Sequence, residues 1–218
     1  MADSMRSTQR FGNRAKEYAA HRPGYPSGAI DAVFAGLSDP CGLVVADVGA
    51  GTGISARLFA DRGASVVAVE PNAAMRASAQ AHPRVTWHDG TAERTGLPDG
   101  SADLVTACQA FHWFATPEAM REFARVARRR VAILQYERDE HDAGTHAYGE
   151  VIRAYATDDT EALRARALAA FEQFPHGPVK RTAVSSDQAL TLEGLLGGLL
   201  RLHISRSTGP LPTHCGAI

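Results

Sequence analysis

The feature that most constrains this chain is an apolar run that ends in an acid and a glycine-rich turn. Residues 43–48 are apolar except for Asp47, and Gly49, Gly51 and Gly53 follow at every second position before a helical pattern begins. This order predicts a buried strand, a tight turn and a helix start, which together hold a nucleotide-like ligand at the carboxyl edge of a parallel sheet. Glycine lets the backbone approach such a ligand, and the free N–H groups of the helix start face an anionic group.

The glycine spacing and two acids narrow the choice of ligand. The dinucleotide fingerprint is Gly-x-Gly-x-x-Gly, whereas Ile54 occupies its last position here. Asp47 would repel a pyrophosphate and attract an ammonium group. The second predicted strand, residues 65–70, ends in Glu70, whose carboxylate can accept both hydroxyls of a ribose. The site therefore favours a ligand with a ribose, an amine and a carboxylate but no phosphate, and S-adenosylmethionine fits that description.

Four segments of the chain carry a resemblance to a known family. They are residues 11–26, 47–53, 69–75 and 90–114, in the usual order, and together they span most of residues 11–136. On these segments the chain resembles the class I S-adenosylmethionine-dependent methyltransferases, in particular the small-molecule group similar to the ubiquinone/menaquinone and trans-aconitate methyltransferases. The resemblance implies that a methyl group passes from S-adenosylmethionine to a small-molecule acceptor by direct displacement.

The resemblance also implies which residues contact the cofactor. The expected cofactor-binding residues are Tyr18, Arg22, Asp47, Gly49, Ala50, Gly51, Thr52, Gly53, Glu70, Pro71, Met75, Thr91, Ala92, Glu93, Gln109 and Ala110. Arg22 is expected to pair with the methionine carboxylate, and the backbone N–H of Ala92 to contact the adenine ring. Thr91 departs from the family pattern, in which an aspartate often accepts the adenine amino group, and Glu93 or Asp89 is the alternative acceptor.

The segment after the fourth predicted strand is where the acceptor and the methyl group are expected to meet. Phe111, Trp113 and Phe114 either wall this cavity, where an aromatic face stabilises a sulfonium, or pack beneath a lid. His112 is the candidate catalytic base, because histidine titrates near neutral pH. A base is needed only for acceptors such as alcohols, and a histidine that merely lies beside the cofactor is the alternative.

The order of predicted elements indicates an α/β fold. Strands are expected at residues 43–48, 65–70, 84–88, 101–107 and 130–136, and helices at residues 53–62, 72–81 and from 116 onward. This alternation predicts a doubly wound, mostly parallel Rossmann-like sheet. The basic run at residues 128–130 is expected to be the solvated end of a helix rather than a nucleic-acid patch. The formal net charge of −1 likewise gives no electrostatic footprint for nucleic acid.

The chain is expected to have four parts. Residues 1–40 form an N-terminal helical cover and residues 41–136 the cofactor-binding core. Residues 137–178 form a helical lid with a helix at 145–157, and residues 179–218 a strand at 179–185 followed by a helix at 187–200. The antiparallel strand that ends the family fold is not found among residues 203–218, so we predict that it is missing and that the C-terminus is truncated or shifted in frame. The alternative function is then a catalytically impaired protein that binds S-adenosylmethionine.

The cysteines and the lengths of the apolar runs limit the classes of protein to which the chain can belong. Cys41, Cys108 and Cys215 form no metal-ligand or disulfide framework, and no apolar run is long enough to span a bilayer. We therefore expect no metal, no membrane and no nucleic-acid partner, and a cytoplasmic protein that is a monomer or a weak homo-oligomer. Cys108 is expected to be a buried strand residue, because it lacks the preceding proline of the carbon-directed nucleic-acid methyltransferases.

Overall fold

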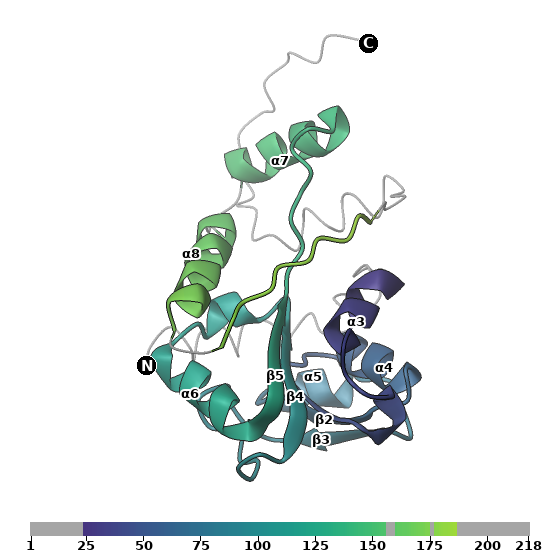
Figure 1. The fold of residues 1–218 in the computed structure, drawn as a ribbon. Helices are drawn as coiled ribbons and strands as arrows, with labels where there is room; N and C mark the ends of the chain where they lie inside the picture. The colour runs from purple at the N-terminus through teal and green to yellow at the C-terminus, as the bar shows by residue number, and fades with distance from the viewer. Residues whose placement is uncertain (1–23, 156–159, 175–176, 187–218) are drawn as a thin grey trace. The chain divides into compact units, whose positions relative to one another are not determined.

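A computed structural model describes residues 24–155, 160–174 and 177–186 of the 218-residue chain (Figure 1). The chain forms two compact units, of which one holds residues 1–137 and 160–190 and the other residues 138–159 and 191–218. The segment predicted to be a lid, residues 137–178, contributes to both units. Tyr18 and Arg22, like the helix predicted at residues 187–200, lie outside the described residues.

The first unit is built on a five-stranded parallel sheet. Its strands are β1 (Val44–Val48), β2 (Ser65–Val69), β3 (Val85–His88), β4 (Ala102–Cys108) and β5 (Ala127–Leu134), in the order β3-β2-β1-β4-β5. All four pairings between neighbouring strands are parallel, which confirms the predicted doubly wound sheet. The connections run outward from β1 to β2 and β3, and then return to place β4 on the other side of β1. The switch point, where such folds bind ligands, therefore lies between β1 and β4.

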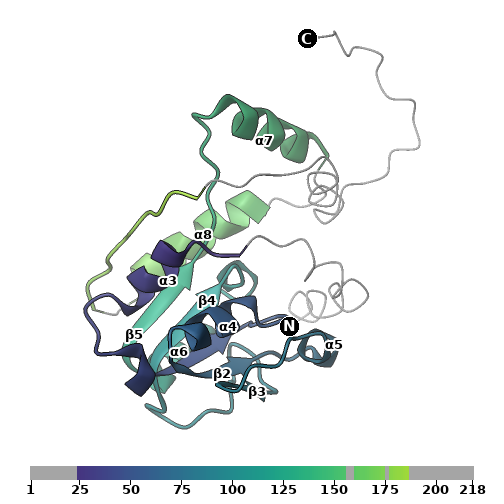
Figure 2. The same ribbon diagram turned by 90° about the vertical axis from the view of Figure 1, so that its right-hand side faces the viewer.

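Helices cover both faces of this sheet (Figure 2). On one face, α3 (Ser27–Phe34) and α4 (Ile54–Asp61) pack against alternate strand residues, with Phe59 fully buried. On the other face, α6 (Pro117–Val126) and α8 (Thr160–Gln173) pack against the intervening residues, with Phe123 almost completely buried. Burial of one such side chain stabilises the fold by roughly 1.5–3 kcal/mol, and two-sided covering explains why every residue of β4 is buried.

The short helix α5 (Ala73–Ala77) covers only part of the predicted helix at residues 72–81. Its start was predicted correctly, because Asn72 caps it by accepting hydrogen bonds from the backbone N–H groups of Ala74 and Met75. The described part of the first unit also contains two short 3-10 helices, η2 (Pro40–Gly42) before β1 and η3 (Phe111–Trp113) after β4.

The basic run at residues 128–130 was predicted wrongly as the end of a helix. The helix α6 ends at Val126, and the three arginines belong to β5. Arg130 donates to the carbonyls of Val33 and Ala35 at the end of α3, at 2.6 and 3.0 Å. The cation therefore does complement the C-terminus of a helix, but of a helix nearly a hundred residues earlier in the chain.

The strand predicted at residues 179–185 is also wrong. Residues 177–186 form neither helix nor strand, and all their side chains are exposed. Val179 and Val184 remain 44% and 39% exposed, so neither valine is buried against the described part of the sheet. The predicted loss of a final antiparallel strand concerns residues 203–218, which lie outside the described ranges.

The second unit is described only over residues 138–155. Its helix α7 (Ala143–Tyr155) starts two residues before the predicted helix at 145–157. Arg153 forms ion pairs with Glu140 and Glu150, which ties the segment before α7 to the helix. Among the described residues of both units, no helix is long and apolar enough to cross a membrane.

Candidate functional site

The glycine loop between β1 and α4 has the backbone that its sequence predicts. Gly49, Gly51 and Gly53 have φ angles of +70°, +59° and +76°, a region that costs other residues roughly 1–2 kcal/mol each. The backbone N–H groups of Gly49 and Ala50 donate to the carbonyl of Val69, at 2.9 and 3.1 Å. The loop is therefore fixed to the end of β2 by hydrogen bonds within the protein.

At two of these positions there is no room for a side chain, so glycine is required there by packing as well as by the positive φ. A Cβ added to Gly49 would lie 2.9 Å from both Ala110 Cβ and Phe114 Cε1, which belong to the segment after β4. A Cβ added to Gly53 would lie 2.8 Å from Trp87 Cζ2 on β3. The ends of β1, β3 and β4 therefore converge on the loop, on either side of the switch point.

Asp47, the acid at the end of β1, is completely buried. One carboxylate oxygen accepts a hydrogen bond of 2.6 Å from Ser55 Oγ, and the other accepts one of 2.9 Å from Thr106 Oγ1. Asp47 therefore joins β1 to the first turn of α4 and to β4. Neither hydroxyl was identified from the sequence, because a serine in a helix and a threonine in a strand carry no signal of what they contact.

Glu70 follows β2 and lies beside the glycine loop. Its Oε2 accepts from the N–H of Gly51 and its Oε1 from the N–H of Asn72, both at 2.9 Å, and the residue is 8% exposed. Burial raises the pKa of Glu70, although these two backbone hydrogen bonds and the charge of Arg76 oppose the shift. Met75 also lies beside the loop, because its Cε would be 3.5 Å from a Cβ added to Gly51.

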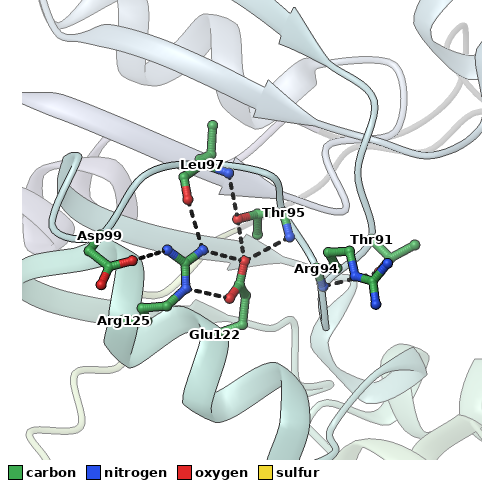
Figure 3. Close-up of polar contacts among 7 residues, drawn as sticks. All are labelled: Thr91, Arg94, Thr95, Leu97, Asp99, Glu122 and Arg125. Atoms are coloured by element: carbon green, nitrogen blue, oxygen red, sulfur yellow. Dashed lines mark hydrogen bonds and ion pairs between the residues drawn. The ribbon is translucent and has the colours of Figure 1, made fainter.

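The residues expected to contact adenine form a closed turn between β3 and β4. The N–H of Thr91 donates to the carbonyl of Arg94, and the N–H of Arg94 donates to both the carbonyl and the hydroxyl of Thr91, at 3.0–3.2 Å (Figure 3). Ala92 is buried, whereas Thr91 is exposed. Asp89, the alternative acceptor, is exposed and forms an ion pair with Arg76.

Gln109, directly after β4, has an unusual backbone and side chain. Its φ of +54° is the only positive value at a non-glycine residue in the described part of the chain. Its side chain is only 7% exposed, yet neither the amide oxygen nor the amide nitrogen has a hydrogen-bond partner among the described residues. The hydroxyl of Thr52 in the glycine loop is likewise buried and unpartnered there. Strain and unpaired buried groups are rare, and they cluster at ligand sites.

The rings of Phe111 and His112, which follow Gln109, pack against different neighbours. Phe111 is fully buried and its ring contacts Phe114, Phe123 and Phe171, so it belongs to the core that α6 and α8 cover. His112 is 7% exposed and packs against Trp113, with ring centroids 4.7 Å apart. Phe111 therefore follows the packing alternative.

Comparison with known proteins identifies this arrangement. Residues 46–134 match the family model of the methyltransferase domain. An uncharacterized methyltransferase of Mycobacterium tuberculosis is 37% identical over 145 residues, which are 65% of this chain and 58% of that protein. An uncharacterized methyltransferase-like protein of Schizosaccharomyces pombe is 28% identical over 189 residues, which are 85% of this chain and 74% of that protein.

A solved structure agrees with these relatives. The structure of a putative type II methyltransferase from Anaeromyxobacter dehalogenans superposes with a TM-score of 0.56 at 28% identity, covering 76% of this chain and 71% of that one. Residues 46–134 therefore form a methyltransferase domain, and the chain has the class I methyltransferase fold. It spans 58% of the length of the mycobacterial relatives that it matches.

Proposed function

We propose that this protein transfers a methyl group from S-adenosylmethionine to a small-molecule acceptor. The observation that carries the proposal is that the glycine loop, which follows β1 at the switch point of the sheet, is hydrogen-bonded to Glu70 at the end of β2 through the backbone N–H of Gly51. A loop that excludes side chains allows close approach of a ligand, and a carboxylate beside it suits the two hydroxyls of a ribose.

The residues present fit the cofactor. The Thr52 hydroxyl and the Gln109 amide are buried and have no hydrogen-bond partner among the described residues, and a polar ligand would satisfy them. In this proposal Glu70 binds the ribose, the glycine loop borders the methionine part, and the turn at residues 91–94 contacts adenine. Pro71, Met75 and Ala110 shape the same pocket. The proposed roles of Tyr18 and Arg22 rest on the family resemblance alone.

Asp47 takes an indirect role in this proposal. Its two oxygens already accept hydrogen bonds from Ser55 and Thr106, so it holds the glycine loop, α4 and β4 in register. Any attraction for the ligand's ammonium group acts through the negative field of Asp47. The sequence-based prediction that Asp47 orients the loop thus stays part of the proposal.

The chain's own contribution to the reaction is alignment. When bound, S-adenosylmethionine supplies a methyl group already activated by its positively charged sulfur. The protein orients the acceptor and excludes water, and orientation contributes up to about 7–11 kcal/mol in well-placed systems. His112 accepts the acceptor's proton if that acceptor is an alcohol. Its near-complete burial beside Trp113 supports a sheltered position for this proton transfer.

Support for a small-molecule acceptor comes from the segment after β4. Gln109, Ala110, Phe111 and His112 stand where amino-directed nucleic-acid methyltransferases carry a polar residue, two prolines and an aromatic residue. The net charge of −1 adds no electrostatic attraction for a phosphate backbone.

Calorimetric titration with S-adenosylmethionine, S-adenosylhomocysteine and NADH tests the cofactor. We expect the first two to bind and NADH not to bind. A folded protein that binds neither sulfur compound would contradict the proposal. Turnover is tested by incubating the protein with methyl-labelled S-adenosylmethionine and fractionated small-molecule extracts, and measuring labelled products. Cofactor binding without any labelled product would instead favour the alternative of an impaired, binding-only protein.

A further inference from the structure

Glu122 of α6 fixes a residue at the base of the turn proposed to contact adenine. Its Oε1 accepts hydrogen bonds from both the backbone N–H and the hydroxyl of Thr95, at 2.8 and 2.6 Å (Figure 3). Thr95 is fully buried. One carboxylate oxygen therefore restrains the backbone and the side chain of the same residue, across 27 positions of sequence.

Arg125, one turn further along α6, holds Glu122 in place. Its Nε donates to Glu122 Oε2 at 2.8 Å, and one terminal nitrogen donates to Oε1 at 2.7 Å and to the carbonyl of Leu97 at 2.8 Å. The other terminal nitrogen pairs with Asp99. The hydrogen bonds from Arg125 are the main cause that lowers the pKa of Glu122 to about 2, so the carboxylate is ionised at neutral pH.

The restraint on Thr95 reaches the turn through close packing. A Cβ added to Gly90 would lie 2.5 Å from the Thr95 carbonyl oxygen and 3.1 Å from Val69 Cγ1. Gly90 is therefore packed between Thr95 and the residue that precedes Glu70. Since Gly90 and Thr95 flank the turn at residues 91–94, fixing Thr95 fixes both ends of that turn relative to β2.

We propose that Glu122 is a positioning residue for recognition of the adenine amino group by the turn at residues 91–94. The proposal rests on the proposed function, because adenine is the ligand group concerned. A site with fixed polar groups rejects a ligand that lacks the matching group, whereas a loose site accommodates both. Glu122 lies on a different element from the turn, so its contribution is to keep the turn's acceptor groups in one place.

The test compares two ligands that differ at that amino group. S-adenosylhomocysteine carries it, whereas S-inosylhomocysteine carries a carbonyl oxygen in its place. We expect the wild-type protein to prefer the adenine compound by at least about tenfold in Kd. In Glu122→Ala we expect this preference to fall about fivefold or more. Thr95→Val removes the hydroxyl that donates to Glu122 but keeps the backbone N–H that does so, and we expect the preference to fall by about half as much on a logarithmic scale. The ratio of two Kd values does not depend on the folded fraction, so general destabilisation leaves it unchanged.

Two further variants separate positioning from general effects. Glu118→Ala removes a carboxylate from the same helix that is exposed and forms an ion pair with Arg121, and we expect its ratio to equal that of the wild type. Glu122→Gln keeps an oxygen that can accept from Thr95, so most of the preference should return.

Each outcome supports or overturns the positioning role. A preference that is unchanged in both Glu122→Ala and Thr95→Val would overturn it, as would a wild-type protein that binds both ligands equally. If the wild type binds neither ligand, the proposed function itself fails and the positioning role fails with it. If Glu122→Ala does not fold, an unchanged preference in Thr95→Val alone overturns the role, and a reduced preference alone supports it.

Discussion

The two halves of the proposed cofactor site differ in how completely their polar groups are paired. At the end of β1 and β2, the chain pairs its own groups, since Gly49 donates to Val69, Gly51 donates to Glu70 and Asp47 accepts from two hydroxyls. At the end of β4, Gln109 has a positive φ and a buried amide without a partner in the described residues. In the described residues the first half leaves only the Thr52 hydroxyl unpaired, whereas the second combines an unpaired amide with a strained backbone, an energetic cost that a ligand can offset.

This difference predicts which substitutions change the stability of the fold and which change ligand binding. A buried polar group left without a hydrogen bond costs roughly 1–3 kcal/mol, and a left-handed backbone at a non-glycine residue adds to that. Substitutions in the β1–β2 half should therefore lower the stability of the fold. Substitutions at Gln109 should remove a cost from the unliganded protein and weaken its interaction with a ligand.

The largest effect is expected for Asp47→Ala. The change leaves the hydroxyls of Ser55 and Thr106 without their acceptor and opens a cavity in the core, so we expect a loss of about 3 kcal/mol in the free energy of unfolding. Urea titration measures it. Ser55→Ala, which removes only one hydrogen bond, should cost about 1 kcal/mol. Equal losses in the two variants would contradict the view that Asp47 joins three elements.

Gly49→Ala tests the close approach between the two halves. Its φ of +70° matches that of Gly36 at +76°, but a Cβ at Gly36 has no atom within 4 Å, whereas one at Gly49 would lie 2.9 Å from Ala110 and Phe114. Gly36→Ala should cost about 1 kcal/mol from the backbone alone. Gly49→Ala should cost a further 1–2 kcal/mol or so from crowding, and should weaken S-adenosylhomocysteine binding while Gly36→Ala does not. Similar stability losses and unchanged affinity in both variants would contradict the contrast.

The sequence predicts the β1–β2 half well because its determinants are local. Glycines at alternate positions specify a turn with positive φ, and an acid directly after a strand lies at the carboxyl edge whatever the rest of the chain does. The sheet follows from the same kind of information, since apolar runs alternate with helical patterns. The residues that hold this half, Ser55 and Thr106, carry no such pattern.

The predictions that failed depend on distant partners. Residues 128–130 have the composition of a helix end, but their partners are Asp103, the carbonyls of residues 100 and 101, and the last carbonyls of α3. Residues 179–185 were predicted to be a strand, but a strand forms only where another strand pairs with it. The strain at Gln109 is equally invisible in the sequence, because glutamine is not a residue that favours a positive φ.

Glu70 should make cofactor affinity depend on pH. Burial raises its pKa above the ordinary value of 4.5, and a protonated carboxyl loses acceptor capacity for ribose hydroxyls. We expect S-adenosylhomocysteine affinity to fall about tenfold as the pH falls through this raised pKa. The stability of the fold should change with pH in the opposite sense to the affinity. Because the native state binds the Glu70 proton more tightly than the unfolded state does, the contribution of Glu70 to the free energy of unfolding declines as the pH rises above 4.5.

Calorimetry over a pH series measures this affinity, with Glu70→Gln as the control. The variant keeps the shape of the side chain but cannot titrate, so its weaker affinity should not change over the same pH range. A wild-type affinity that follows the same flat profile would contradict the assignment of Glu70 to the ribose.

The smallest expected effect, and the one most specific to the β4 half, is a gain in stability for Gln109→Gly. Glycine adopts a φ of +54° without strain and carries no buried amide, so the unliganded protein should become more stable by about 1 kcal/mol. Gln109→Ala removes the amide but keeps the strained φ, so it should gain less. A loss of stability in Gln109→Gly would show that the amide is already satisfied in the unliganded protein.

Ligand binding by Gln109→Gly then locates the amide within the site. Weaker binding of S-adenosylhomocysteine, together with the gain in stability, would mean that the cofactor offsets the cost at Gln109. If the variant gains the same stability but binds S-adenosylhomocysteine as tightly as the wild type, the methyl acceptor is the ligand that pairs with the amide. S-adenosylhomocysteine alone would then leave the amide unpaired. In either case a ligand offsets the cost of the strained backbone and buried amide in the β4 half, and substitutions at Gln109 measure that cost.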